Sequence, residues 1–245
     1  MVKNKNIIVL GGNGLIGNAV VESCVEYGAK VLSVDLNPSS IQRKEVTYIE
    51  LDLLNDSHEL YSRITELNFN FDSIIDCTYF KRDGFGSHGF DDISESDFME
   101  SININVKSIF RIYKPLLELL KKNQKGKLVL LGSIYGNLTY DLDLYKNTNM
   151  VPSPEYIFLK AGLHNFSKYL ASVYGPHGVN INVVAAGGVF NNQNSEFVKK
   201  YSQKTFLKKM ATPMDIAAPC VFLASDHANY ITSEVLVVDG GYSNS

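Results

Sequence analysis

The chain is poor in cysteine, and its few cysteines show no pairing pattern. Cys24, Cys77 and Cys220 are far apart, and no CxxC motif occurs. An odd number of distant cysteines argues against a disulfide framework and against a metal site. We therefore expect buried, reduced thiols and no bound metal. Reduced thiols are typical of the cytoplasm, which is the location we expect.

The chain also lacks an excess of either charge and any long apolar run. It has 23 basic and 26 acidic residues and a net charge of −3. This balance gives no basic footprint for nucleic acid and no polybasic patch for a membrane. The first apolar run, residues 7–10, is too short for a signal peptide, and no stretch approaches the roughly 18 apolar residues of a membrane span. We see no internal repeat and no low-complexity linker.

Short apolar runs recur along the 245 residues, and helical patterns fill most of the gaps between them. The runs are nearly continuous in Val, Ile and Leu, which is typical of strands buried on both faces of a parallel sheet. They cover residues 7–10, 30–35, 46–52, 73–77, 127–133, 180–186 and 235–239. Strand–helix alternation predicts an α/β fold with a doubly wound parallel sheet of about seven strands flanked by helices. We expect a single domain over residues 1–245.

Two segments interrupt the alternation, and both are expected to be functional loops. Residues 137–153 are polar and rich in tyrosine, and residues 187–204 contain FNNQN. Long loops after parallel strands are where ligands usually bind. Helix starts are expected at Ser94 or Ser96 and at Thr212, where TPMD resembles a capping box.

A glycine-rich turn follows the first strand. Gly11, Gly14 and Gly17 form G-x-x-G-x-x-G between a predicted strand and a predicted helix. Glycine lets the backbone turn tightly and approach a pyrophosphate, and the helix N-terminus supplies N–H groups and partial positive charge. The strand–turn–helix context predicts a dinucleotide site of the Rossmann type.

Acidic residues follow the second and third strands. Asp35 can accept a hydrogen bond from the adenosine ribose 2′-OH and would repel a 2′-phosphate, which favours NAD over NADP. Alternatively, Asp35 caps a turn. Arg43 and Lys44 are not far away in sequence. Asp52 and Leu53 are expected near the adenine, with Asp52 accepting from the exocyclic amine.

The motifs together resemble the short-chain dehydrogenase/reductase family over essentially the whole chain. The glycine turn, Asp35 and Asp52 are followed in family order by NINVKSIF, LGSIYG, EYIFLK and VVDGGYS. The resemblance implies a Rossmann fold with a cofactor-binding half at about residues 1–125 and a catalytic and substrate-loop half at about residues 126–245. It also implies a catalytic tetrad of Asn105, Ser133, Tyr156 and Lys160, with Asn103 as an alternative to Asn105.

The residue types of this tetrad suit hydride transfer between an alcohol and a nicotinamide. A free tyrosine, with a pKa of about 10, holds its proton too tightly at neutral pH. Lys160 lies on the same helix face as Tyr156, and its ammonium together with the oxidised nicotinamide would lower that pKa. Ser133 would hydrogen-bond the substrate oxygen. The resemblance implies that Lys160 also holds the nicotinamide ribose and that Asn105 holds a water.

The chain departs from the family at several places. The usual Asn-Asn-Ala-Gly turn after the fourth strand reads Asp-Cys-Thr-Tyr (residues 76–79), and the usual Pro-Gly after the sixth strand is Ala-Gly (residues 186–187). The segment between Ser133 and Tyr156 is enlarged by residues such as NLTYDLDLYKNTNMVPSP. The cofactor contacts that we expect come from Gly11, Asn13, Gly14, Leu15, Ile16, Gly17, Asp35, Leu36, Asp52, Leu53, Cys77, Thr78, Tyr156, Lys160, Gly187 and Val189.

The insertion, TYFKRDG and GGVFNNQ resemble a narrower group, the oxidoreductases of bacterial flagellin glycosylation and legionaminic-type sugar biosynthesis. This resemblance implies a sugar, sugar phosphate or nucleotide sugar as substrate. Lys81 and Arg82 could pair a phosphate or could be solvated turn charges. Tyr140, Tyr145 and Asn147 could bind a sugar or simply pack the loop. Asn191 stands where the family often has a threonine that contacts the carboxamide.

Two functions therefore follow from the sequence. The first is an NAD(H)-dependent oxidoreductase acting on a hydroxyl or carbonyl of a small polar substrate. The alternative is a non-catalytic dinucleotide sensor or scaffold on the same fold. Family habit further implies a homodimer or homotetramer built on the helices that begin near Phe98 and at Glu155.

Overall fold

The computed structural model describes residues 1–37 and 43–245 and contains one seven-stranded parallel sheet with strand order β3-β2-β1-β4-β5-β6-β7. The strands are β1 (Asn6–Leu10), β2 (Lys30–Asp35), β3 (Val46–Glu50), β4 (Ser73–Asp76), β5 (Gly126–Ser133), β6 (Val179–Ala186) and β7 (Val235–Val238). The strand order changes direction between β1 and β4, which creates a crevice at their carboxyl ends. The expected doubly wound α/β fold of seven strands is confirmed.

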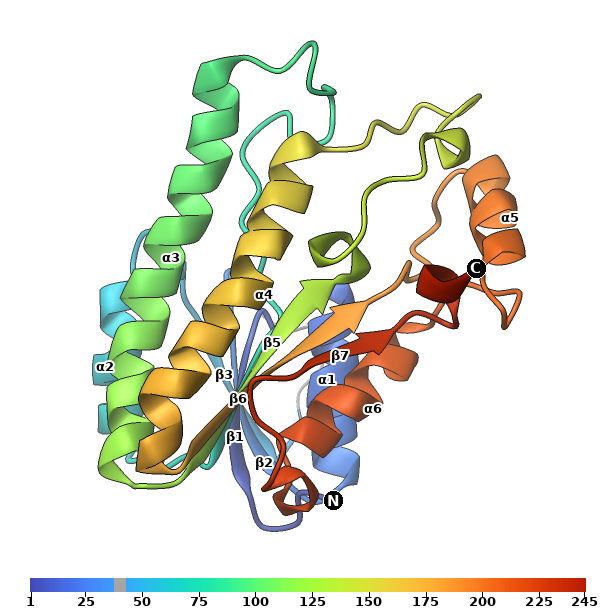
Figure 1. The fold of residues 1–245 in the computed structure, drawn as a ribbon. Coiled ribbons are helices and arrows are strands. Elements are labelled where there is room, and N and C mark those ends of the chain that lie inside the picture. Colours follow the sequence, from blue (N-terminus) through green and yellow to red (C-terminus); the bar gives the residue numbers. More distant parts are fainter. Residues whose placement is uncertain (38–42) are drawn as a thin grey trace.

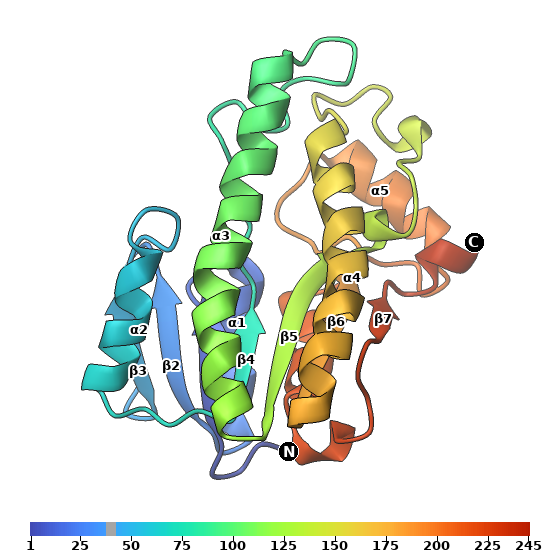
Figure 2. The ribbon, with the colours of Figure 1, turned by 60° about the vertical axis from the view of Figure 1, so that its left-hand side comes forward.

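Helices cover both faces of the sheet, as Figures 1 and 2 show. One layer holds α2, α3 and α4, and the other holds α1 and α6, while α5 lies beyond the end of the sheet. The helices are α1 (Leu15–Glu26), α2 (Ser57–Glu66), α3 (Glu95–Lys122), α4 (Pro154–Tyr174), α5 (Ser195–Lys204) and α6 (Pro213–Leu223).

Alternate residues of each central strand point into two different cores. In β1, Ile8 and Leu10 pack in the core under α2, α3 and α4. Ile7 and Val9 pack in the core under α1 and α6. All four side chains are fully buried, which explains why the strand reads as a continuous apolar run.

Side-chain caps fix where the main helices begin. Ser94 caps α3 by accepting from the Asp97 N–H, and Ser153 caps α4 by accepting from the Tyr156 N–H. Thr212 and Asp215 form the expected capping box at the start of α6. The cap of α4 matters most, because it sets the backbone position from which Tyr156 projects.

The expectation of a loop over residues 187–204 was wrong in its second half. Asn194 caps α5 by accepting from the backbone N–H groups of Glu196 and Phe197. Phe197 and Tyr201, one turn apart, bury their rings in a third apolar cluster. A short helix with one apolar face thus replaces the expected coil.

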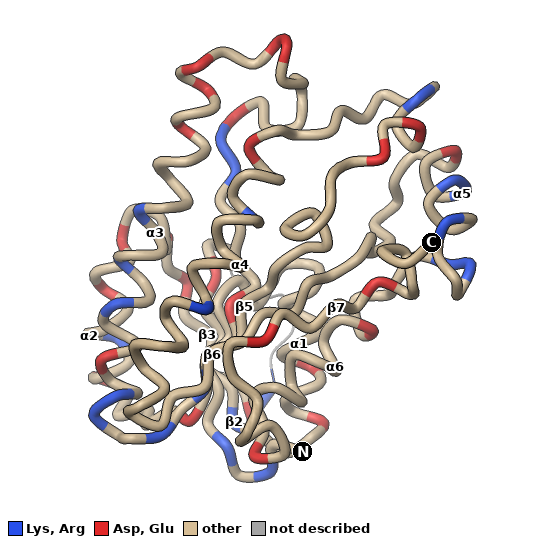
Figure 3. The backbone as a smooth tube through the Cα atoms, viewed as in Figure 1, with Lys and Arg blue, Asp and Glu red and all other residues tan. Residues whose placement is uncertain are grey.

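Charge and thiol chemistry are ordinary elsewhere in the molecule. Figure 3 shows acidic residues at the N-terminal end of α3 and basic residues at its C-terminal end, as the helix dipole favours. All three cysteines are free thiols, and burial raises the pKa of Cys220 to about 12.

Within the described residues, no helix combines the length and apolarity needed to cross a bilayer.

Candidate active site

The glycine turn packs the start of α1 tightly against the end of β1. Gly11 has a φ of +72°, and its N–H donates to the Val34 carbonyl at 2.8 Å. A Cβ on Gly17 would collide with the carbonyl of Gly11. Gly14 is the N-cap of α1, with no side-chain cap and no acidic residue in the first turn. This helix end is therefore suited to an anionic group such as a pyrophosphate.

Asp35 sits beside this turn at the end of β2. Its Oδ2 accepts from the Asn13 N–H at 2.9 Å, and its Oδ1 accepts from the Asn37 N–H at 3.3 Å. The Arg43 guanidinium pairs with Glu22 at 2.8 Å. The nearest arginine in sequence is therefore already occupied by a carboxylate on α1.

A cavity of about 390 Å³ extends over the ends of β1, β2 and β3. Its predicted cofactor residues are Gly11, Gly14, Asp35, Leu36, Asp52, Leu53, Cys77 and Thr78. Asp52 accepts from the Leu54 N–H at 2.9 Å and from the Asn55 side chain at 2.8 Å. These bonds lower its pKa against the opposing effect of burial, so the carboxylate stays ionised as an acceptor. The size and lining of the cavity fit the adenosine half of a dinucleotide.

A second cavity, of about 300 Å³, brings Ser133, Tyr156 and Lys160 together. Because these are the predicted catalytic residues, we call it the catalytic cavity. Ser133 ends β5, whereas Tyr156 and Lys160 lie one turn apart on α4. Lys160 is buried, and its Nζ donates to the Leu131 carbonyl at 2.8 Å. Of the predicted cofactor residues, Ile16, Cys77, Thr78, Tyr156, Lys160, Gly187 and Val189 line this cavity. Cys77 and Thr78 line both cavities, so the two adjoin.

Burial dominates the protonation of the Tyr156–Lys160 pair. Burial raises the pKa of the Tyr156 phenol, and its hydrogen bond with Ser133 opposes this increase. Burial lowers the pKa of Lys160 to about 8, and the negative charge of Asp76 opposes that decrease. The lysine Nζ lies 5.6 Å from the Tyr156 ring centroid. A lowered tyrosine pKa therefore remains a prediction for the site with oxidised cofactor bound.

Asn105 holds the turn after β4 against α3. Its side-chain amide accepts from the Phe80 N–H at 3.3 Å and donates to the carbonyls of Phe80 and Ser101. Asn105 and Lys160 line one small cavity between α3 and α4. Asn103, the alternative, is exposed. The geometry therefore favours Asn105 as the residue next to the site.

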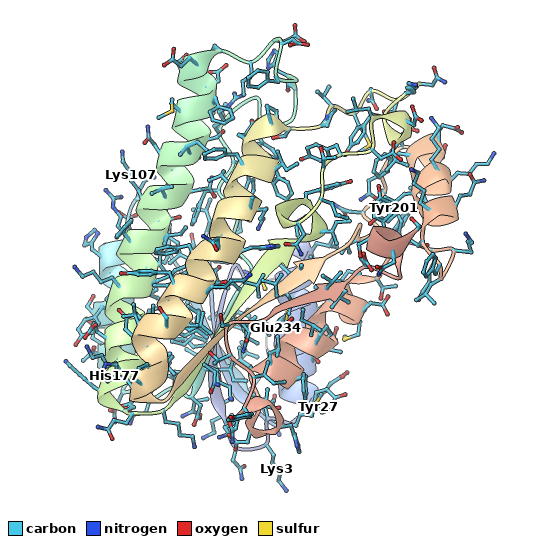
Figure 4. The ribbon with its side chains drawn as sticks, viewed as in Figure 1. Lys3, Tyr27, Lys107, His177, Tyr201 and Glu234 are labelled. Atoms are coloured by element: carbon cyan, nitrogen blue, oxygen red, sulfur yellow. The ribbon has the colours of Figure 1, made fainter. Side chains whose placement is uncertain are left out.

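The far wall of the catalytic cavity is aromatic. Tyr145, Phe197 and Tyr201 line it. The ring centroid of Phe197 lies 5.5 Å from that of Tyr145 and 5.9 Å from that of Tyr201. Tyr201 stacks on Tyr242 at 4.7 Å and accepts the Gly188 N–H at 2.6 Å. Figure 4 shows Tyr201 between α5 and the C-terminal turn.

The predicted substrate residues do not converge on one place. Tyr145 alone lines the catalytic cavity; Lys81 lines the cofactor cavity, and Asn191 is exposed. Tyr140 donates its hydroxyl to the Ser153 carbonyl at 3.0 Å. Arg82 is buried, and its guanidinium faces Glu155 at 3.7 Å. Its position is internal, rather than that of a solvated turn charge.

Three predicted cofactor residues line neither cavity. Asn13 donates its backbone N–H to Asp35, and Leu15 is exposed on the first turn of α1. Gly17 packs beneath Gly11. Their effect on a cofactor would come through the shape of the turn.

Sequence reasoning missed several residues of the site. Asp76 and Tyr79 were recognised only as departures from the family turn, yet both line the small cavity that Lys160 also lines. His164 follows Lys160 by one turn, and this spacing could have indicated that it lies behind Ser133. Tyr201 could have been found from its i, i+4 spacing with Phe197.

Comparison with known proteins identifies the wider group. Residues 13–243 match a family model described as enoyl-(acyl carrier protein) reductase. The chain is 27% identical to post-translational flagellin modification protein A of Campylobacter coli, covering 99% of both chains. It is 25% identical to a probable galactose dehydrogenase of Rhizobium meliloti, covering 98% of this chain and 95% of the relative.

Solved structures agree with the sequence matches. A short-chain dehydrogenase from Leptospira borgpetersenii with bound NAD⁺ is 30% identical and superimposes with a TM-score of 0.88, covering 98% of this chain and 93% of that one. ElxO with bound NADP shares the fold at 22% identity and a TM-score of 0.84, covering 99% and 100%. With the glycine turn, the Ser133–Tyr156–Lys160 cavity and the match over residues 13–243, the chain belongs to the short-chain dehydrogenase/reductase family.

Proposed function

We propose that the chain is an NAD(H)-dependent oxidoreductase that acts on a hydroxyl or carbonyl of a sugar, sugar phosphate or nucleotide sugar in surface-glycan, flagellin-modifying biosynthesis. One observation carries the proposal. Ser133, Tyr156 and Lys160 line a single cavity that adjoins the cavity over the glycine turn, with Cys77 and Thr78 shared between them. A substrate bound against the tyrosine would therefore lie next to the nicotinamide end of a bound dinucleotide.

The side chains have separate tasks in this proposal. When bound, the nicotinamide cofactor supplies the hydride acceptor or donor. Tyr156 takes the proton from the substrate hydroxyl in oxidation and returns it in reduction. Ser133 hydrogen-bonds the substrate oxygen, and the Lys160 ammonium favours the phenolate electrostatically. Asn105 holds the turn after β4 against α3.

NAD is the cofactor favoured by the residues near the ribose site. Asp35 is fixed by the Asn13 N–H at the edge of the cofactor cavity. Its charge would oppose a 2′-phosphate, and Arg43 is paired with Glu22 rather than directed to this edge.

The catalytic cavity supports a neutral, hydroxyl-bearing ring as the reacting part of the substrate. Among the described residues that line it, Lys160 is the only charged one. Uncharged hydroxyl and amide groups from Thr78, Ser133, Gln193 and several tyrosines line it beside apolar side chains. Aromatic faces with a few hydroxyl and amide groups suit a sugar ring. Because Arg82 is paired internally, support for a phosphate is limited to Lys81 on the cofactor side. The relative named a probable galactose dehydrogenase supports a sugar substrate, and the relative named a flagellin modification protein supports the proposed pathway.

Tyr156→Phe tests the proposed chemistry. NADH binding, followed by its fluorescence, is expected to stay within about threefold of the wild type, while turnover of NAD⁺ with a panel of sugars and sugar phosphates falls by at least about 10³-fold. Tyr169→Phe, an exposed tyrosine on the same helix, is the matched control and should leave both properties unchanged. Retained turnover in Tyr156→Phe would refute the proton-transfer assignment.

The same experiment separates the enzyme from a dinucleotide sensor. A sensor would bind NADH in both variants and oxidise or reduce none of the panel. If the chain is an enzyme, the absorbance at the nicotinamide band changes with the wild type and with Tyr169→Phe but not with Tyr156→Phe.

A further inference from the structure

Asp76 places a buried carboxylate behind the catalytic lysine. It ends β4 and is 4% exposed. The Tyr113 hydroxyl donates to its Oδ2 at 2.5 Å, and the Thr78 N–H donates to its Oδ1 at 2.8 Å. A buried carboxylate is costly unless hydrogen-bonded and paired with a positive charge. The bonds from Tyr113 and Thr78 satisfy the hydrogen-bonding requirement. A nearby cation still has to balance the negative charge.

A small cavity connects Asp76 with Lys160. Its volume is about 40 Å³, which gives room for at least one water molecule. It lies between the turn after β4, the middle of α3 and the first turns of α4. Among the described residues that line it, Asp76 is the only acidic one and Lys160 the only basic one. Lys160 gives one of its three N–H groups to the Leu131 carbonyl, so two donors remain for this cavity and for the catalytic cavity.

We propose that Asp76 is the buried counterion of Lys160, and that its carboxylate, held by Tyr113, keeps the lysine charged next to Tyr156. Asp76 is a positioning residue in this role, because it acts through Lys160 and does not line the catalytic cavity. In the Asn-Asn-Ala-Gly turn that is usual in the family, a neutral asparagine amide stands at the position of Asp76. The carboxylate is therefore a property of this chain's own turn.

Other groups around Lys160 cannot replace this charge. The rings of Tyr79 and Tyr156 lie 5.3 and 5.6 Å from its Nζ. Cys77 beside Asp76, Tyr113 on α3 and His164 one turn along α4 complete the titratable neighbours. Burial raises the pKa of both the Cys77 thiol and the Tyr113 phenol, and burial lowers the pKa of His164 to about 4. All three are neutral at neutral pH. Burial also raises the pKa of Asp76, but the hydrogen bonds from Tyr113 and Thr78 and the charge of Lys160 oppose that increase. Asp76 is the one carboxyl group among the described residues that line the shared cavity, so it is the candidate anion.

The test measures the titration of Lys160 directly in the cofactor-free protein. Lysine is labelled with ¹³C at Cε, and the Lys160 signal is assigned by its loss in Lys160→Arg. The signal is then followed by NMR between about pH 6 and pH 10. Asp76→Asn is expected to lower the pKa of Lys160 by about one unit or more, because the neutral amide no longer favours the ammonium.

Two matched variants control the experiment. Asp72→Asn removes a carboxylate just before the other end of β4, where it faces Lys5, and should leave the Lys160 titration unchanged. Tyr113→Phe keeps the Asp76 charge and removes its donor, so the shift should be smaller than in Asp76→Asn. If Asp76→Asn fails to fold by circular dichroism, Asp76→Ser is titrated in its place.

An unchanged Lys160 titration in a folded Asp76 variant would overturn the proposal and leave Asp76 a structural residue. The kinetic form of the proposal rests on the proposed function. In Asp76→Asn, the pH at which the rate of substrate oxidation reaches half its maximum should rise. The NMR result needs no turnover. A shift without any activity would therefore refute the proposed function and leave the counterion intact.

Discussion

His164 accepts a hydrogen bond at Nε2 from the backbone N–H of Ser133, at 3.4 Å. Its Nδ1 lies 3.0 Å from the Asn137 side-chain oxygen, so the neutral ring with a proton on Nδ1 satisfies both neighbours. A Cβ on Gly132 or Gly136 would collide with the imidazole. The histidine thus fills a space left by two glycines and fixes the strand end that carries Ser133.

This arrangement predicts a loss of stability in mild acid. Burial lowers the pKa of His164 to about 4, below the value of about 6.5 in an unfolded chain. The neutral ring's stabilisation is complete above pH 6.5 and is lost as the pH falls toward 4, by about 3 kcal/mol at most. Urea unfolding of wild type and His164→Gln at several pH values measures it. If the free energy of unfolding fell equally with pH in the two proteins between pH 6.5 and pH 4, the prediction would be contradicted.

Gly17→Ala should damage the cofactor turn without touching the catalytic cavity. The added Cβ collides with the Gly11 carbonyl and must push α1 away from the turn. We expect NADH affinity to fall at least about tenfold and stability to drop by about 1–3 kcal/mol. Isothermal titration and thermal unfolding measure the two effects. The control is Gly162→Ala, where a Cβ meets nothing within 4 Å.

Asp35→Ser should weaken the preference for NAD. The substitution removes the charge that opposes a 2′-phosphate, so the ratio of the NADPH to the NADH dissociation constant should fall by about tenfold or more. Arg43→Ala should leave this ratio unchanged, since Arg43 pairs with Glu22. A large effect of Arg43→Ala would instead place this arginine at the cofactor.

The Arg82–Glu155 pair should behave as a coupled unit. Arg82 and Glu155 are 8% and 1% exposed, and the Arg82 Nη2 lies 3.7 Å from the Glu155 Oε1. Arg82→Met leaves the buried Glu155 carboxylate uncompensated, which typically costs about 3–5 kcal/mol. Glu155→Gln leaves Arg82 with the more exposed carboxylate of Asp97, 3.9 Å away, and should cost less. The double variant should recover much of this loss, as a double-mutant cycle in urea would measure. Additive losses would show that the two charges act independently.

We further propose that the chain forms a homodimer or homotetramer through the outer faces of α3 and α4. Phe110 on α3 and Phe158 on α4 are 61% and 60% exposed, and burial of these two rings between copies of the chain would stabilise an oligomer. Phe110→Glu with Phe158→Glu should give a smaller molar mass by light scattering. Leu142→Glu, an equally exposed position in a loop, is the control. An unchanged mass in the double variant would exclude this face.

The fold was predictable because its signal is local, whereas parts of the site depend on distant contacts. Ile7 to Leu10 are apolar at every position because both faces of the strand are buried, and this pattern is visible in the sequence. The positions of Ser133, Tyr156 and Lys160 followed from motif order. Arg82 looked like a surface charge, since its partner Glu155 is brought close only by tertiary folding. Tyr140 and Tyr145 are near in sequence, yet only Tyr145 reaches the cavity, because the Tyr140 hydroxyl bonds the Ser153 carbonyl.

The stacking of Tyr201 has a consequence for altering substrate range. This one ring contacts Phe197 and Tyr242 and holds the Gly188 backbone, so helix α5, the loop after β6 and the C-terminal turn share a support. Substitutions at these positions will not act additively. A library meant to broaden the substrate range should therefore vary Tyr145, Phe197 and Tyr201 in combination, because a gain at one position depends on how the other two repack.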